Sequence, residues 1–287
     1  MKKFVKLGFA MVIAMAFTLT GCKHSTSEPE PAPQPIVVEG ITGSEVFIEG
    51  RRVEIIPTLW MCDHEVTQAE YTAIMGTNPS FFKDTPADGE TQGNRPVERV
   101  SWYDCLVYCN KRSINEGLAP CYTISGKTDP AEWGDVPTTN DDTWNAVTCN
   151  FEANGYRLPT EAEWEYMARG GNLTNEGQTE YSGSDTIGDV AWYRDNSDDK
   201  SHEVKKKAPN AKGMYDMSGN VWEWCWDWYG TIDADTPSNG ASSGSYRVFR
   251  GGCWVSLASN CSVASRYDVN PDGRGDDLGF RLVRSAN

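Results

Sequence analysis

Cysteine and histidine are the side chains of this chain best suited to bind a soft metal or to act as nucleophiles. The sequence of 287 residues contains nine cysteines and three histidines. Cys105 and Cys109 stand four residues apart in a segment that we expect to be helical, a spacing that places both thiols on one helix face. No C-x-x-C pair accompanies them, and few histidines are present to complete a site. We therefore expect buried thiols here rather than a zinc site.

The end of the chain, from Arg250 to Arg284, contains a few arginine, glycine, proline and aromatic residues, which we call the frame residues. Mostly small residues separate them. Two glycines beside Trp254 permit a tight turn of the backbone against a large buried ring. The Ser, Asn, Asp, Gly, Val and Ala between them follow neither a helical nor a strand period, so this stretch predicts a contact surface rather than a core. The frame residues are Arg250-Gly251-Gly252, Trp254, Arg266, Pro271, Arg274 and Gly279-Phe280-Arg281.

The charge of the chain argues against one class of partner. The formal net charge is −15, and it becomes more negative if a leader containing Lys2, Lys3 and Lys6 is removed. A strongly acidic protein repels phosphate backbones, so we expect no nucleic-acid partner. Eleven Trp, twelve Tyr and nine Phe supply enough bulky apolar surface for a core.

Residues 1–21 are typical of a lipoprotein signal peptide. A basic start at Met1-Lys2-Lys3 precedes the apolar run Leu7 to Leu19, which is too short to span a membrane comfortably. Leu19-Thr20-Gly21-Cys22 then resembles the lipobox of bacterial lipoproteins, whose cysteine carries the lipid anchor. We expect export, lipid attachment at Cys22, and display on the outer membrane facing the cell exterior. An ordinary secretory signal is the alternative.

The remaining chain divides into a tether and one domain. Residues 22–36 are polar and rich in proline, which predicts an extended tether, and residues 37–287 form one expected globular domain. An even number of cysteines in an exported chain permits disulfides, although the sequence does not settle their pairing. The eight cysteines beyond Cys22 are Cys62, Cys105, Cys109, Cys121, Cys149, Cys225, Cys253 and Cys261.

Three capping boxes predict helices. In each, a Ser or Thr hydroxyl can accept from a free amide near the helix start, while an acid three residues on reaches back. A glycine beyond the end supplies the left-handed cap. The expected helices lie between Thr67 and Gly76, Ser101 and Gly117, and Thr160 and Gly170.

Short aromatic or β-branched runs predict strands between these helices. They occur at residues 46–48, 53–55 and 246–249, whereas residues 126–144 have the Pro, Gly and Asp content of a loop. The expected class is α+β with little regular structure.

Four motifs follow one another along the chain. They are Glu65-Val66-Thr67 with Tyr71, residues 157–166 (RLPTEAEWEY), residues 213–224 (GMYDMSGNVWEW), and Arg250-Gly251-Gly252-x-Trp254 with Gly279-Phe280-Arg281. In this order they resemble the formylglycine-generating-enzyme, or sulfatase-modifying-factor, family. The resemblance extends over residues 40–284 and implies an elaborated C-type lectin fold with long loops.

The resemblance also implies a structural calcium site in the Trp-rich motif. The family ligands fall on the carboxylates of Asp216 and Glu223 and on the backbone carbonyls of Gly219 and Val221, and such oxygens suit Ca²⁺. Alternatively, the two acids cap turns and pair with nearby arginines. A second family calcium site would use Asp189, Asn196 and Asp198.

The catalytic copper site of the family is incomplete in this sequence. Oxidases of the family bind Cu(I) through two cysteines, and their positions fall on Ser256 and Cys261 here. Serine is a hard neutral ligand and cannot replace a thiolate. Cys253 is three residues from the required position, and in an extended segment this odd offset would direct it to the opposite face. We therefore expect no copper and no oxidase activity.

One branch of the family is more similar still. In this branch the C-type lectin fold is the scaffold of a diversity-generating retroelement, which rewrites a short C-terminal region at template adenines. Asn codons rewritten in this way yield the residue types found here, so the resemblance implies a diversified ligand-binding surface over residues 253–277. An ordinary solvated loop is the alternative. The contact residues would be Cys253, Val255, Ser256, Leu257, Ser259, Asn260, Ser262, Ser265, Tyr267, Asp268, Val269, Gly273, Gly275, Asp276 and Asp277.

Three functions compete for this chain. The first is a surface-displayed binding protein, in which rigid frame residues present a changeable surface to a protein or peptide ligand, including one on another cell. The second is a copper-dependent formylglycine-generating oxidase that uses Cys261 with Cys253. Copper binding and oxidation of a sulfatase-type peptide cysteine would support this second hypothesis. The third is an invariant structural module that packs on other envelope proteins. A Ser/His/Asp hydrolase is disfavoured because no G-x-S-x-G turn occurs.

Overall fold

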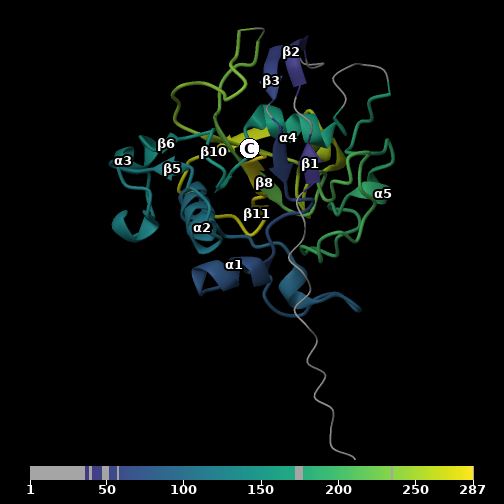
Figure 1. The fold of residues 1–287 in the computed structure, drawn as a ribbon. Helices are drawn as coiled ribbons and strands as arrows, with labels where there is room; N and C mark the ends of the chain where they lie inside the picture. Colours follow the sequence, from purple (N-terminus) through teal and green to yellow (C-terminus); the bar gives the residue numbers. More distant parts are fainter. Residues whose placement is uncertain are drawn as a thin grey trace, which may run out of the picture. The chain divides into compact units, whose positions relative to one another are not determined.

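Two four-stranded sheets carry the framework of the folded part (Figure 1). One has the order β1-β4-β12-β7, and the other, which bears the predicted contact region, has the order β10-β9-β8-β11. Strands β2 and β3 pair by themselves, as do β5 and β6. The strands are β1 (Ile36–Val38), β2 (Ile41–Val46), β3 (Arg52–Ile56), β4 (Leu59–Met61), β5 (Tyr122–Thr123), β6 (Thr148–Cys149), β7 (Tyr156–Arg157), β8 (Trp222–Trp228), β9 (Arg247–Arg250), β10 (Arg266–Val269), β11 (Leu278–Gly279) and β12 (Val283–Ser285).

This computed structural model describes residues 36–38, 41–46, 52–56, 58–171, 177–233 and 235–286. The expected signal peptide of residues 1–21, the lipidation site Cys22, and the tether up to residue 35 lie outside the described residues and stay predictions. Among the helices of the described part, none is long and apolar enough to cross a membrane.

The three capping boxes produce the helices that the sequence predicts. Thr67, Ser101 and Thr160 each accept from the backbone amide of the acid three residues on, and that acid accepts from the backbone of the cap residue. The helices, with their short companions, are α1 (Gln68–Met75), α2 (Trp102–Asn115), α3 (Asp142–Asn145), α4 (Glu161–Ala168) and α5 (Ile187–Val190), and the 3₁₀ turns η1 (Gln92–Asn94), η2 (Pro130–Glu132) and η3 (Ala258–Cys261).

Only part of the strand prediction is confirmed. Strand β9 begins at Arg247, and β3 contains residues 53–55, as expected. Strand β2 ends at Val46, and residues 47–48 lie outside the described residues. The expected loop of residues 126–144 contains η2 and the start of α3. The mixed α+β class with little regular structure is confirmed.

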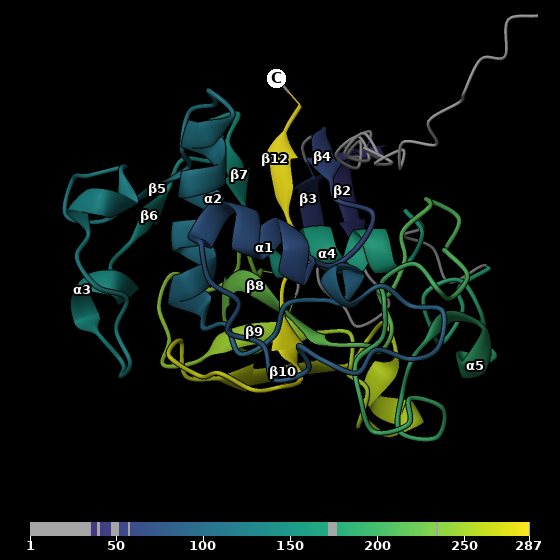
Figure 2. The ribbon, with the colours of Figure 1, turned by 90° about the horizontal axis from the view of Figure 1, so that it is seen from below.

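Strand β10 forms one edge of the second sheet, with β9 and β8 next in order (Figure 2). In the antiparallel β9–β10 pair, Phe249 lies opposite Tyr267, and Arg247 lies opposite Val269. Side chains alternate between the faces of a strand. Arg247 and Phe249 therefore share one face of β9, while Arg250 points to the other face, where α4 packs.

The main core lies between α2 and the second sheet. Trp102, at the start of α2, donates from Nε1 to the carbonyl of Cys225 at 2.9 Å. Trp224 on β8 donates in return to the carbonyl of Val100 at 3.0 Å. Both rings are fully buried, so each polar atom needs a partner and finds one on the opposing element.

A buried ion pair joins strand β8, in the middle of the second sheet, to the segment between β11 and β12. Arg281, after β11, donates from Nε to one carboxylate oxygen of Glu223 on β8 at 2.6 Å and from an amino group to the other at 2.5 Å. Trp164 of α4 donates to the same carboxylate at 2.7 Å. Both charged side chains are fully buried, so neither has water as a substitute partner.

The Glu223→Gln variant should lose several kcal/mol of unfolding free energy. Removal of one member of a buried pair leaves the Arg281 charge uncompensated, which costs about 3–5 kcal/mol. The matched control is Glu132→Gln, because Glu132 pairs with Lys127 in a pair that is half exposed, and such pairs contribute at most about 1 kcal/mol. Urea unfolding of both variants measures the difference. Equal losses in the two variants would contradict the role assigned to this pair.

Candidate functional site

The predicted contact residues fall on four pieces of structure at the edge of the second sheet and on the connections between them. The pieces are a turn at residues 253–256, the 3₁₀ turn η3, strand β10, and the loop of residues 270–277, while Leu257, Ser262 and Ser265 lie in the connections. Apart from β10 the segment consists of turns and loop, so side chains, rather than backbone ladders, define most of its surface.

Three large apolar side chains stand out from this segment into solvent. Val255 is 38% exposed, Leu257 is 51% exposed and Tyr267 is 41% exposed. They are three of the seven large hydrophobic side chains that are exposed among the described residues. A gathering of exposed apolar side chains in one segment marks an interaction surface more than single scattered ones do.

Tyr267 rests on an aromatic support. Its ring centroid lies 5.0 Å from that of Trp222 and 6.1 Å from that of Phe249, with the Phe249 ring nearly parallel to it. These strand residues belong to β8 and β9 and not to the contact region. A ring held in this way loses little freedom when it binds, which favours affinity.

Small hydroxyl side chains hold the backbone between η3 and β10. Ser262 and Ser265 share a hydrogen bond of 2.9 Å between their hydroxyls, and Ser265 also donates to the carbonyl of Ser259 at 2.8 Å. Ser259 itself is exposed. The other predicted contact residues are half-buried, and they are Asn260, Ser262, Ser265, Asp268, Val269, Gly273, Gly275, Asp276 and Asp277.

Cys253 and Ser256 do not reach the surface, contrary to the prediction that they contact a ligand. Cys253 is 1% exposed and Ser256 is 6% exposed. The segment is a turn closed by a 3.0 Å hydrogen bond from the Ser256 amide to the Cys253 carbonyl. The argument for opposite faces assumed an extended segment and does not apply to this turn, in which Sγ of Cys253 lies 3.1 Å from Oγ of Ser256.

The frame arginines are fixed by the acids of α4. Arg250 donates to Glu165 at 2.9 Å and to the carbonyl of Val263 at 2.9 Å. Arg266 holds both carboxylate oxygens of Glu161 at 2.7 Å each. A bidentate pair of this kind fixes position as well as charge, so the predicted contact segment is attached to α4 just before its start, at Arg250, and again within it, at Arg266.

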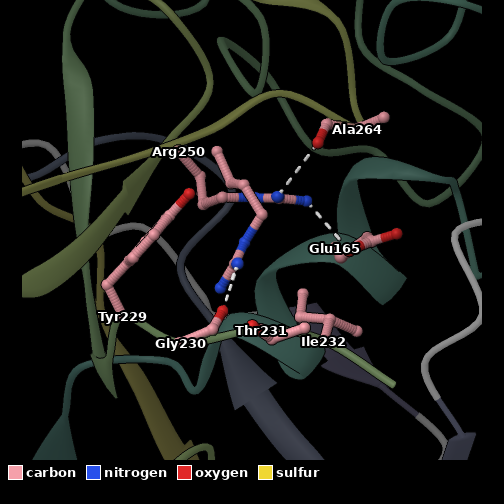
Figure 3. Close-up of a pocket in the computed structure, with 8 residues that line it drawn as sticks. Glu165, Tyr229, Gly230, Thr231, Ile232, Arg250 and Ala264 are labelled. Atoms are coloured by element: carbon pink, nitrogen blue, oxygen red, sulfur yellow. Dashed lines mark hydrogen bonds and ion pairs between the residues drawn. The ribbon is translucent and has the colours of Figure 1, made fainter. Parts of the chain in front are cut away.

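A pocket of about 350 Å³ opens between these arginines and the chain after β8 (Figure 3). Arg266 donates across it to the carbonyl of Gly230 at 2.6 Å, and the ring of Tyr229 lies 4.4 Å from the Arg266 guanidinium. Because both arginines are already bound to glutamates, their charges are compensated. The lining residues are Glu165, Tyr229, Gly230, Thr231, Ile232, Arg250, Ala264 and Arg266.

Gly251 and Gly252 adopt the left-handed backbone conformation that the frame requires, with φ of 99° and 82°. A Cβ atom on Gly252 would lie 2.5 Å from Sγ of Cys261 and 2.9 Å from its Cα. Trp254 follows, donating from Nε1 to the carbonyl of Asp276 at 3.2 Å and meeting Phe82 edge-on at 5.1 Å between ring centroids. The glycines thus permit η3 to pack directly on the backbone beneath Trp254.

Two residues far away in the sequence hold the exposed turn, and the sequence reasoning missed them. Arg194 donates from its amide to the carbonyl of Ser256 at 3.1 Å and from Nε to that of Val255 at 3.2 Å. Ser197 donates from its hydroxyl to the carbonyl of Trp254 at 2.7 Å. No local pattern marks them, because the side chains of Arg194 and Ser197 act on backbone carbonyls 61 and 57 residues away.

The residues expected to hold calcium have other partners in this structure, and calcium binding by them stays a prediction. Both carboxylate oxygens of Glu223 are bound by Arg281, so a guanidinium already supplies the positive charge. Asp216 accepts from the Lys205 amide at 2.8 Å, and its other oxygen has no hydrogen-bond partner. Burial raises the pKa of Asp216 to about 6, and Glu223 adds to the rise. Gly219 and Val221 belong to the tight turn before β8, where the amide of Val221 donates to Glu65 at 3.0 Å.

The second set of expected calcium ligands performs turn functions. Asn196 accepts from the amide of Tyr193 at 2.8 Å and donates to the carbonyl of Ala191 at 2.9 Å. Asp189 accepts from the Ser184 hydroxyl at 3.3 Å, and Asp198 has a left-handed backbone with φ of 51°. Within the described ranges, no group of three His, Cys, Asp or Glu side chains is placed to hold a metal ion.

The eight cysteines beyond Cys22 are free thiols in the structure, and all but Cys149 are buried. Cys105 and Cys109 lie within α2, where burial raises the pKa of both thiols well above the ordinary value. The prediction of buried thiols at this pair is confirmed. Burial also raises the pKa of Cys253 to about 12, with Asp277 adding to the rise, and it raises that of Cys261 to about 12.

Sequence comparison assigns the class of protein that this fold and site define. Residues 25–286 match the family described as "Sulfatase-modifying factor enzyme 1-like domain". The chain belongs to this family, and its fold is the C-type lectin-like fold of the formylglycine-generating-enzyme group.

A solved structure of high similarity is that of Treponema denticola variable protein 1. Its sequence is 39% identical, the TM-score is 0.78, and the match covers 87% of this chain and 94% of that one. "Chaperone protein LppX" of Paenibacillus barcinonensis is 42% identical over 240 residues, which are 77% of this chain and 78% of that protein. The formylglycine-generating enzyme of Streptomyces coelicolor is 36% identical over 165 residues, and the match covers only half of each chain, 50% and 51%.

The Gly252→Ala variant should be clearly less stable than Gly76→Ala. Both glycines have a left-handed backbone, φ 82° and 77°, which costs an alanine about 1–2 kcal/mol. A Cβ on Gly76 meets nothing within 4 Å, whereas one on Gly252 clashes with Cys261. We expect an additional loss of about 1–3 kcal/mol for Gly252→Ala, as in overpacked cores. Thermal and urea unfolding compare the two variants, and losses of the same size would argue against close packing of η3 on this turn.

Proposed function

We propose that this chain is a surface-displayed ligand-binding lipoprotein, and that the binding site is the variable surface of residues 253–277. The observation that carries the proposal is the presence of Val255, Leu257 and Tyr267 as exposed apolar side chains on one segment, which ion pairs attach to α4 at Arg250, before its start, and at Arg266, within it. Similarity to a solved variable protein with the same fold supports it. The expected lipid anchor at Cys22 and the tether would place this surface outside the outer membrane.

The frame residues stabilise the fold, whereas the exposed residues between them form the proposed contact surface. This separation of roles favours a binding function. Arg250 and Arg266 are bound to acids of α4, and Trp254 is packed on Phe82, so the frame is held without help from the exposed residues. Substitutions at Val255 or Leu257 would change what the surface binds and would lower the free energy of unfolding only slightly. Antibody loops combine a fixed scaffold with adaptable small and polar residues in the same way.

The chemistry of the surface favours a protein or peptide ligand. Exposed aliphatic and aromatic groups, Leu257 and Tyr267 among them, suit the apolar centre of a protein interface. Asp268, Asp276 and Asp277 make the rim acidic, which opposes phosphate-rich ligands. The ligand is therefore expected to be neutral or basic.

The oxidase alternative has one observation in its favour, the short distance between Cys253 and Ser256. The thiol of Cys253 lies beside the serine that takes the place of a family copper-binding cysteine. Against it, Cys253 and Cys261 both have pKa values raised to about 12 by burial, and Cu(I) binds thiolates. We propose that the chain binds its ligand without copper.

Replacing the exposed apolar side chains should abolish binding. A peptide selected by display on the intact protein should lose at least 100-fold in affinity for the triple variant Val255→Ser, Leu257→Ser, Tyr267→Ser, because interface centres concentrate binding energy in such groups. Ile114→Ser is the matched control, since Ile114 is also exposed, at 42%, but belongs to α2. Calorimetric titration measures both. Unchanged affinity for the triple variant would place the ligand site elsewhere.

The diversified character of the surface predicts a second copy of its coding sequence. A near-repeat of the stretch that encodes residues 253–281 should lie beside a reverse-transcriptase gene and differ only at template adenines. Sequencing the flanking DNA tests this prediction. If no such repeat exists, the surface is an invariant binding site, and the retroelement part of the proposal fails while the binding part still stands.

A further inference from the structure

A second candidate site lies around Arg247 of β9, next to the variable surface but built from other residues. Its guanidinium is stacked between two indole rings, 3.7 Å from the centroid of Trp102 and 3.4 Å from that of Trp228. A third ring, that of Trp226, lies at 5.3 Å. The Arg247 side chain is almost completely buried, at 2% exposure.

Arg247 has no carboxylate bound to it among the described residues. One amino nitrogen donates to the carbonyl of Trp226 at 2.7 Å, and Nε has no hydrogen-bond partner. By contrast, the buried Arg157, Arg250 and Arg281 are each in ion pairs with glutamate. A buried charge normally requires such a partner. A bound anion would supply the partner that Arg247 lacks among the described residues.

The electrostatics of Arg247 agree with this geometry. Burial lowers its pKa to about 9, although attraction from Asp227 acts in the opposite direction. Asp227 also accepts a hydrogen bond from the amide of Glu161 at 2.8 Å. Aromatic rings attract the cation by cation–π interaction but do not neutralise its charge.

Arg247 is one of the residues that line a pocket of about 620 Å³. Its volume lies within the range of small-molecule sites. Two half-buried indoles, those of Trp226 and Trp228, form aromatic walls, and Asn145, Asn239 and Ser242 bring polar groups to it. Arg247 is the one charged residue among the lining residues of this pocket.

We infer that this pocket binds a small molecule with one carboxylate on an aromatic or other apolar body, through Arg247 and its tryptophans. A carboxylate matches the planar guanidinium in shape and compensates its single charge. The apolar body of such a ligand would pack on the indole walls. A phosphate dianion would leave one negative charge without a cationic partner in the same pocket.

This site is independent of the proposed variable surface. None of the residues that line the pocket belongs to the predicted contact set. Val269 lies opposite Arg247 in the β9–β10 ladder, yet it is not one of the lining residues. Variation of residues 253–277 would therefore leave the carboxylate site in place, as a constant site beside a changeable one.

Titration of the intact protein with three related probes tests the inference. Benzoate should bind with a Kd on the order of 1 mM, as expected for so small a ligand. Benzyl alcohol, which has no charge, should bind at least tenfold more weakly. Phenyl phosphate should bind no more tightly than benzoate. Ligand-observed NMR suits affinities in this range.

Two variants locate the binding. Arg247→Met removes the cation and should weaken benzoate binding tenfold or more. Ser242→Trp places a bulky ring in the pocket from an exposed position, so the fold should survive while benzoate binding is lost. Tyr267→Ser and Arg99→Met lie outside the pocket and should leave the benzoate Kd unchanged.

Other outcomes would overturn the inference. Equal affinity for benzoate and benzyl alcohol would show that Arg247 does not recognise charge. An unchanged benzoate Kd in Ser242→Trp would place the site elsewhere. Tenfold tighter binding of phenyl phosphate would replace the carboxylate assignment by a phosphate one, and loss of benzoate binding in Tyr267→Ser would remove the independence from the variable surface.

Discussion

The buried ion pair between Glu223 and Arg281 is the interaction on which the rest of the fold depends. Arg281 reaches three separate segments, because it also donates to the carbonyls of Cys62 at 3.3 Å and Tyr215 at 2.9 Å. Two buried charges contribute stability only when nearly all their polar atoms have partners. The pair therefore fixes the place where the second sheet, α4 and the long loops meet, in a fold that has few regular elements to do so.

Ion pairs also stabilise the edge of the second sheet, where we propose that the ligand binds. Glu161 and Glu165 of α4 hold Arg266, within the proposed contact segment, and Arg250, just before it. The glycines after Arg250 bring η3 against the backbone, and Arg194 binds the carbonyls of the exposed turn. Since these contacts involve charged frame residues or the backbone, the exposed side chains are free to differ without loss of the fold.

The two pockets near this surface differ in whether the charges of their arginines are compensated by carboxylates. The pocket beside α4 contains Arg250 and Arg266, and glutamates already bind both of them. The pocket beside β9 contains Arg247, which has tryptophans around it and no ion pair with a described residue. An anion would gain little at the first and would supply the missing counter-charge at the second.

The sequence by itself determined those features that depend on residues close together in the chain. Capping boxes at Thr67, Ser101 and Thr160 identified three helices, because a cap and its partner acid lie three residues apart. The ordered motifs identified the family and hence the lectin-like fold. The apolar contacts Val255, Leu257 and Tyr267 followed from that resemblance and are exposed as predicted.

Only the tertiary structure decided which partner each buried group has. The turn that joins Cys253 to Ser256, the bidentate pairing of Glu223 with Arg281, and the stacking of Arg247 on Trp228 all depend on contacts within the folded chain. Glu223 and Arg281 are 58 residues apart. Burial and electrostatic compensation are properties of the assembled core, and no local pattern of residue types records them.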